Sequence, residues 1–231
     1  MLHGRITCYC IATVTPAGLT AFPALSRISR TPEAAATRAL SDFDVRHNFV
    51  GSFTWELPSP PKSMGLLRAI AGGWQWGGIF LASAGLPLSV GIGGDPLGLN
   101  SAVTFAFADR LNTPGCSSAV DPGNIHYIKI ACFAFPNPST RLGNAGRNIL
   151  PGPHLYNTDT SLVRNIKAME RLNIQFRTEL FNILNHTNFS DPSRTNVAIF
   201  NQTGAVVPTG GLITSTATTS RQIQFGLKLT W

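Results

Sequence analysis

The last eleven residues carry the clearest pattern of hydrophobic and polar positions in the chain. Apolar side chains occupy every second position there, at Ile223, Phe225, Leu227, Leu229 and Trp231. Polar residues, including Gln222, Gln224 and Lys228, alternate with them. Strict alternation of this kind predicts a β-strand with one apolar face and one polar face. At about 3.3 Å per residue, eleven residues span about 36 Å. Tilted near 45°, they cover about 25 Å, which is the height of the apolar band of an outer-membrane barrel.

Similar alternation predicts four further strands after Asp42. They are expected over residues 42–57, from Trp74 onward, over 156–166 and over 172–185. The uncharged stretch 69–90 is also long enough for a transmembrane helix. However, its five glycines and one proline make a poor helix and favour a strand.

The connections between these strands alternate between short and long. The short ones cover residues 58–72 and the turn near Met169, and the long ones cover 91–155 and 186–220. If the C-terminus faces the periplasm, both short turns fall on the periplasmic side and both long loops fall outside, as in outer-membrane barrels. A secreted soluble β-sandwich that binds a ligand is the alternative, but it has no reason to sort its loops in this way.

The predicted fold class is therefore all-β: an antiparallel transmembrane β-barrel segment of about five C-terminal strands, with long extracellular loops. Residues 41–231 form this barrel portion, and residues 1–40 form an N-terminal segment without clear periodicity. Within it, Thr31–Leu40 could form a short helix, and the first 25 residues resemble a signal peptide poorly. Five strands cannot close a barrel, and an odd number would force a parallel seam between copies of the chain.

The amino-acid composition and the lack of known motifs exclude several classes of function. Only 13% of the residues are charged, which suits a polar lining that is mostly uncharged. The formal net charge is +7, but Lys and Arg are scattered, so we expect no nucleic-acid binding. No motif for catalysis, for a cofactor or for a metal stands out, so we expect none of these functions. Cys116 and Cys132 could form a disulfide or remain two free thiols.

Charged and amide side chains on the strands are candidates for lining a barrel lumen. They are Asp159, Arg164, Arg177, Glu179, Gln222, Gln224 and Lys228. If they face inward, they could form a cross-strand polar network.

Five segments resemble the C-terminal barrel of TonB-dependent outer-membrane receptors of the Oar-like type, which carry a carboxypeptidase-regulatory-like domain. These motifs are Ser41–Phe49, Gly73–Phe80 with Ser83–Pro87, Leu142–Asn148, Glu179–His186 and Arg221–Phe225. They occur in the order found in that family and cover roughly residues 42–231.

The resemblance implies a location in the outer membrane and a role in energy-coupled uptake or in surface adhesion. It implies contact with outer-membrane lipid, with the rest of the receptor barrel and with its plug. The terminal strand would carry the signal for the barrel-insertion machinery, through Phe225, Leu227, Leu229 and Trp231. The sequence shows neither a plug nor a TonB box, so we expect a fragment that is not competent alone and that meets the TonB complex only through other parts of the receptor.

Overall fold

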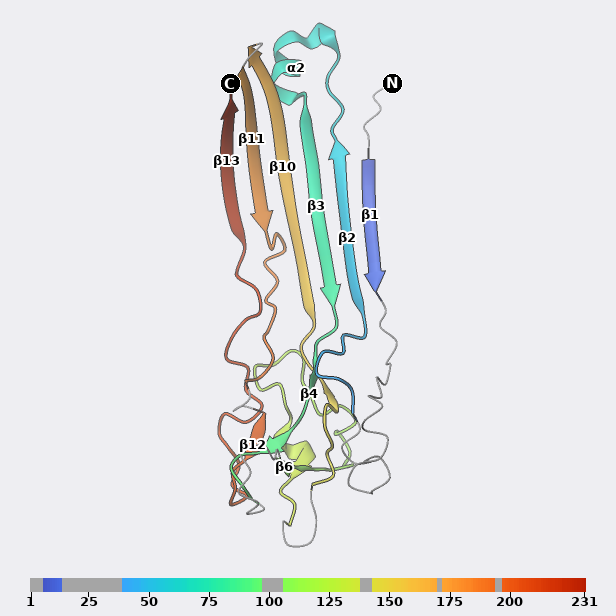
Figure 1. The fold of residues 1–231 in the computed structure, drawn as a ribbon, viewed down its shortest axis with the longest axis vertical. Coiled ribbons are helices and arrows are strands. Elements are labelled where there is room, and N and C mark those ends of the chain that lie inside the picture. The colour runs from blue at the N-terminus through green and yellow to red at the C-terminus, as the bar shows by residue number, and fades with distance from the viewer. Residues whose placement is uncertain (1–5, 14–38, 97–105, 138–142, 170–171, 194–196) are drawn as a thin grey trace, which may run out of the picture.

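Six long strands form one antiparallel sheet in the computed structural model, which describes residues 6–13, 39–96, 106–137, 143–169, 172–193 and 197–231. The strands are β1 (Ile6–Thr13), β2 (Asn48–Glu56), β3 (Trp74–Ser83), β10 (Leu155–Met169), β11 (Leu172–Phe181) and β13 (Gln222–Thr230). They follow one another across the sheet in the order β1-β2-β3-β10-β11-β13. Figure 1 shows them side by side along the long axis of the molecule.

The five strands predicted after Asp42 are confirmed, with corrected ends. The first begins at Asn48 rather than at residue 42, because the Asp44 N–H donates to the Ser41 carbonyl in a turn (3.0 Å). The strand predicted over 172–185 ends at Phe181, because the asparagines at 182 and 185 adopt positive φ angles of 48° and 50°. A left-handed backbone cannot continue a strand.

The sixth strand, β1, was not predicted. Its backbone pairs with β2 along its whole length, from Ile6 opposite Trp55 to Thr13 opposite Asn48. With six strands, the two edge strands β1 and β13 run in opposite directions (Figure 1). The expectation of a parallel seam between copies of the chain is therefore wrong. With six strands, the edge β13 of one copy could pair antiparallel with the edge β1 of another. The six described strands do not close into a barrel.

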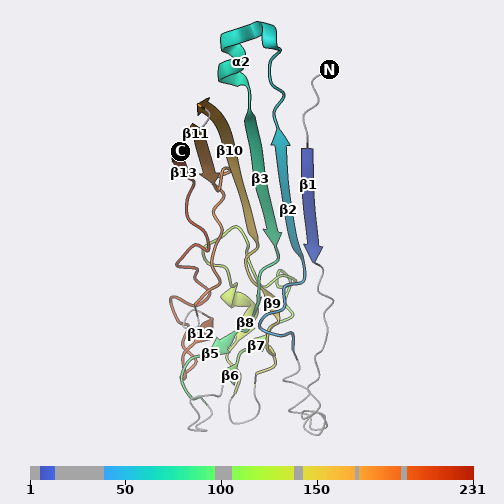
Figure 2. The same cartoon turned by 45° about the horizontal axis from the view of Figure 1, so that its top comes forward.

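Short and long connections lie at opposite ends of the sheet, as predicted. The β2–β3 connection holds the 3-10 helix η3 (Lys62–Met64) and the helix α2 (Gly65–Ala71), at the same end as the C-terminus (Figure 1). The two long connections lie at the other end (Figure 2).

A short helix is predicted over Thr31–Leu40, but residues 31–38 lie outside the described residues. No helix in the described ranges is long and apolar enough to span a membrane.

The long connections form a packed unit rather than open loops. Short elements build it: β4 (Pro87–Leu88), β5 (Gly91–Ile92), β6 (Ala106–Phe107), β7 (Asp109–Arg110), η4 (Ile130–Cys132), β8 (Phe133–Ala134), β9 (Leu150–Pro151) and β12 (Ala198–Phe200). All members of its buried hydrophobic cluster lie between Leu88 and Ile213, outside the six long strands. A disulfide joins Cys116 to Cys132 within this unit. Of the two states that the sequence allowed, a disulfide or two free thiols, the structure therefore shows the disulfide.

Candidate functional site

One face of the sheet is a continuous apolar surface. The register aligns Ile174 with Leu229, Phe176 with Leu227, Thr178 with Phe225 and Leu180 with Ile223. Phe225 and Leu227 are 68% and 67% exposed, and Trp231, just after the strand, is 90% exposed. In a soluble sandwich a second sheet would cover such a face. Among the described residues no second layer does so, and lipid is the environment that suits this face.

Aromatic side chains mark both ends of the apolar face. Trp55, Trp74 and Trp76 lie near the short-turn end, and Phe49, Phe80 and Tyr156 lie towards the loop end. Within these groups, the rings of Trp55 and Trp76 are 6.1 Å apart, and those of Phe49 and Phe80 are 5.9 Å apart. Two such belts are typical of the two membrane–water interfaces of a transmembrane barrel.

Most of the predicted lumen residues share the opposite, polar face. The register places Glu179 opposite Gln224, Phe181 opposite Gln222 and Gln175 opposite Lys228. Arg177 and Asp159 alternate onto this face too, and the Arg177 Nη1 to Glu179 Oε1 distance is 3.3 Å. The Arg177 side chain is 51% exposed, so water screens this ion pair and its contribution to stability is small.

Arg164 is a correction to the predicted lumen lining. It lies five positions after Asp159 in β10, and an odd separation places two strand residues on opposite faces. The register sets Arg164 between Trp74 and Phe176 on the apolar face. Its guanidinium carbon lies 5.4 Å from the Trp74 ring centroid, a cation–π contact at the level of the aromatic belt.

Buried asparagines hold the loop unit against the ends of the strands. Asn182, directly after β11, donates from Nδ2 to the carbonyls of His186 (3.0 Å) and Thr219 (3.1 Å). Its own N–H donates to Asp159 Oδ1 at 2.8 Å. A single residue therefore connects β10, through its backbone N–H, with the turn after β11 and the segment that leads into β13, through its side chain.

Asn188 makes the next connection and is 1% exposed. Its amide accepts from the Tyr156 N–H and donates to the Tyr156 carbonyl, both at 2.8 Å, as a neighbouring strand would. It also donates to Thr218 Oγ1 at 2.9 Å. Breaking such contacts would leave buried polar groups unsatisfied, which costs about 1–3 kcal/mol for each group.

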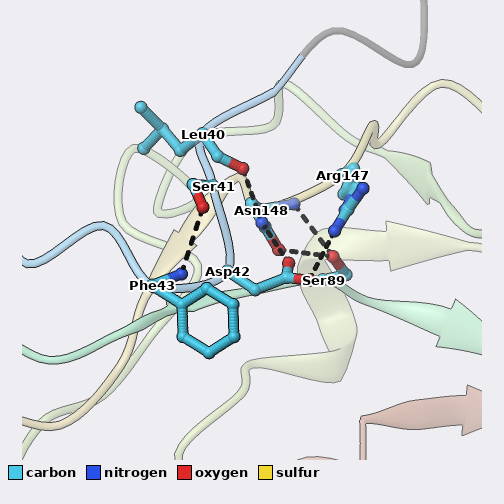
Figure 3. A network of polar contacts seen from close by, with 7 residues as sticks. All are labelled: Leu40, Ser41, Asp42, Phe43, Ser89, Arg147 and Asn148. Carbon is cyan, nitrogen blue, oxygen red and sulfur yellow. Dashed lines mark hydrogen bonds and ion pairs between the residues drawn. The ribbon is translucent and has the colours of Figure 1, made fainter. Parts of the chain in front are cut away.

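A third connection lies where the chain enters β2 (Figure 3). Asn148, with φ 56°, donates from Nδ2 to Asp42 Oδ1 and to the Leu40 carbonyl, both at 2.7 Å. Arg147 Nη2 lies 2.5 Å from Asp42 Oδ2. The Asn148 N–H donates to Ser89 Oγ at 2.9 Å. This network joins segments that are about one hundred residues apart in sequence, as Figure 3 shows.

These connections coincide with segments singled out in the sequence. Asp42 belongs to the motif 41–49 and meets Asn148 of the motif 142–148, while Asn182 belongs to the motif 179–186. No periodicity or motif in the sequence predicts a role for these asparagines. The one local signal is the residue type itself, because Asn tolerates the left-handed backbone that Asn148 and Asn182 adopt.

A family model described as an outer membrane beta barrel domain matches residues 17–224. The chain belongs to this family. No curated protein and no solved structure matches it significantly. The match agrees with the uncovered apolar face and its aromatic belts, and it places the protein in the outer membrane of a Gram-negative bacterium.

Membership in the outer-membrane barrel family assigns the two ends of the sheet. In such barrels short turns face the periplasm and long loops face outward, so the disulfide-linked unit lies at the cell surface. The soluble sandwich is not supported, because the described strands form one long sheet with no second sheet packed on it. Among the described residues, no three His, Cys, Asp or Glu side chains come together as a potential metal site.

The surface unit of this outer-membrane barrel contains a titratable core residue. Tyr127 is 2% exposed and its hydroxyl donates to the Pro151 carbonyl at 2.9 Å. Burial, with a smaller effect from Asp191, raises the pKa of Tyr127 to about 12. Burial also raises the pKa of Asp191 above its ordinary value.

We expect the surface unit to lose stability between pH 10 and 12. An unfolded tyrosine ionises near pH 10, so the preference of the folded state for the neutral phenol contributes fully below pH 10 and is lost as the pH rises through about 12. Two pKa units correspond to about 2–3 kcal/mol. Urea unfolding at pH 9 and pH 12 measures this loss. Tyr127→Phe should remove it, and an equal pH dependence in that variant would contradict the assignment.

Proposed function

We propose that this outer-membrane barrel is part of a TonB-dependent receptor of the Oar-like type, which takes up or binds large solutes at the cell surface. The observation that carries the proposal is the folded surface unit with its own core and disulfide. A receptor for a large ligand needs a stable extracellular surface, and loops without a core do not provide one. The ordered motifs described above support the same family.

In this proposal the polar face, with Arg177, Glu179 and Lys228, lines a lumen that a plug fills. Further strands of the receptor pair with the edges β1 and β13, because unpaired backbone groups in hydrocarbon cost several kcal/mol each. The barrel-insertion machinery recognises β13, and the TonB complex acts through the plug region of the receptor. The chain has no catalytic role and does not bind nucleic acid.

The test is to purify complexes that contain the chain from formaldehyde-treated cells. We expect a plug domain and TonB in these complexes, and we expect a protonophore to reduce the TonB yield. A general porin from the same cells is the control and should carry no TonB. Robust single-channel conductance from the purified chain alone, with no TonB cross-link, would overturn the proposal. A plug without TonB would favour adhesion over uptake.

A further inference from the structure

The β2–β3 connection at the periplasmic end carries apolar side chains that contact no core. Met64, Leu66 and Ile70 are 50%, 78% and 59% exposed. None of the residues 61–71 whose side chains are described is buried. A seven-residue helix is not stable by itself, because helix nucleation is costly. Something other than a protein core must therefore hold α2 in place.

Two side chains of the apolar sheet face hold the C-terminal end of this helix. Trp74 donates from Nε1 to the Ile70 carbonyl at 3.0 Å. Arg164 donates from Nη2 to the Ala69 carbonyl. A cation beside the last carbonyls also complements the helix dipole. Because Trp74 and Arg164 lie on the lipid-facing side and in the aromatic belt, α2 is fixed at the level of the lipid headgroups.

The charge of this connection is entirely positive. Residues 58–73 contain Lys62 and Arg68 and no acidic residue, and Arg164 adds a third cation beside them. On the helix, Leu66 and Ile70 are four positions apart and share one side, while Arg68 lies about 200° away from each. An apolar pair on one side of α2 and a cation on the other, with Lys62 just before the helix, match the pattern of a helix that lies in a membrane interface.

We propose that α2 is an interfacial helix that binds anionic phospholipid of the periplasmic leaflet. Leu66 and Ile70 enter the boundary between headgroups and acyl chains, and Lys62 and Arg68 contact lipid phosphates. The helix gathers anionic lipid around the periplasmic rim of the barrel and fixes the depth at which this rim lies in the membrane. This inference does not depend on TonB coupling, so it stands or falls separately from the proposed function.

The test measures which lipid surrounds the helix. The full chain, with Cys8→Ser, Cys10→Ser and Leu66→Cys, carries an environment-sensitive fluorophore at position 66. The assembled barrel is moved from the outer membrane into phosphatidylcholine nanodiscs that contain 20% of a brominated quencher lipid, either phosphatidylglycerol or phosphatidylcholine. We expect quenching by both lipids and stronger quenching by brominated phosphatidylglycerol.

Matched variants separate the effect of charge on lipid preference from an effect on the fold of the barrel. Each cation near an anionic surface contributes about a fivefold preference at low salt, so Lys62→Gln with Arg68→Gln should lower the phosphatidylglycerol preference by about 25-fold. Arg46→Gln, an exposed cation at the loop end, should leave it unchanged. A fluorophore at Thr203→Cys, in the surface unit, should not be quenched. Equal quenching by the two lipids, or none at position 66 in a barrel of normal heat-modifiable mobility, would overturn the proposal.

Discussion

Deletion of residues 222–231 should reduce the protein in the outer membrane by at least about tenfold, and Trp231→Ala should reduce it several-fold. Nine aligned residue pairs join β13 to β11, so the deletion exposes the edge of β11. Each unpaired backbone group in hydrocarbon costs several kcal/mol, and the total far exceeds the 5–15 kcal/mol that stabilises a typical protein. The alternating apolar row that ends at Trp231 is lost in the same change.

Surface biotinylation and membrane fractionation measure this outcome. Thr230→Ala is the matched control, because Thr230 neighbours Trp231 but belongs to the polar row of β13. We expect its level to equal that of the unaltered protein. Normal surface levels of the Trp231→Ala variant would contradict the role of the terminal aromatic residue, and normal levels of the deletion would contradict the role of β13 as a whole.

Leu227→Arg should destabilise the folded barrel by about 2–4 kcal/mol, whereas Gln224→Arg should change its stability by less than about 0.5 kcal/mol. Leu227 lies in the middle of β13, opposite Phe176 on the apolar face. An arginine there must keep its charge in hydrocarbon near the centre of the bilayer. Gln224 lies on the polar face opposite Glu179, where a new guanidinium meets a carboxylate and water.

Reversible urea unfolding in lipid vesicles, followed by tryptophan fluorescence, measures both variants. The pair is matched, because both changes introduce the same side chain into the same strand three positions apart. Equal destabilisation by the two substitutions would mean that the two faces of the sheet share one environment. The assignment of the apolar face to lipid and the polar face to the lumen would then be wrong.

The spacing of residues along β10 is enough to predict the face on which Arg164 lies. Asp159 and Arg164 are separated by an odd number of residues, so a continuous strand had to place them on opposite faces. Their charge suggests one shared face, but their spacing excludes it. The structure then added what spacing cannot supply: Arg164 lies on the Trp74 ring and reaches the end of α2.

Period-two alternation determined the five strands after Asp42, their two faces and the opposite placement of short and long connections, because strand formation and side-chain direction depend on neighbouring residues. Only the tertiary structure decided the pairing of β1, the disulfide and the packed surface unit. Asp42 meets Asn148 across 106 positions, and Asn188 reaches Tyr156 across 32. Contacts of this kind depend on which distant segments the sheet brings together, and no local pattern records that information.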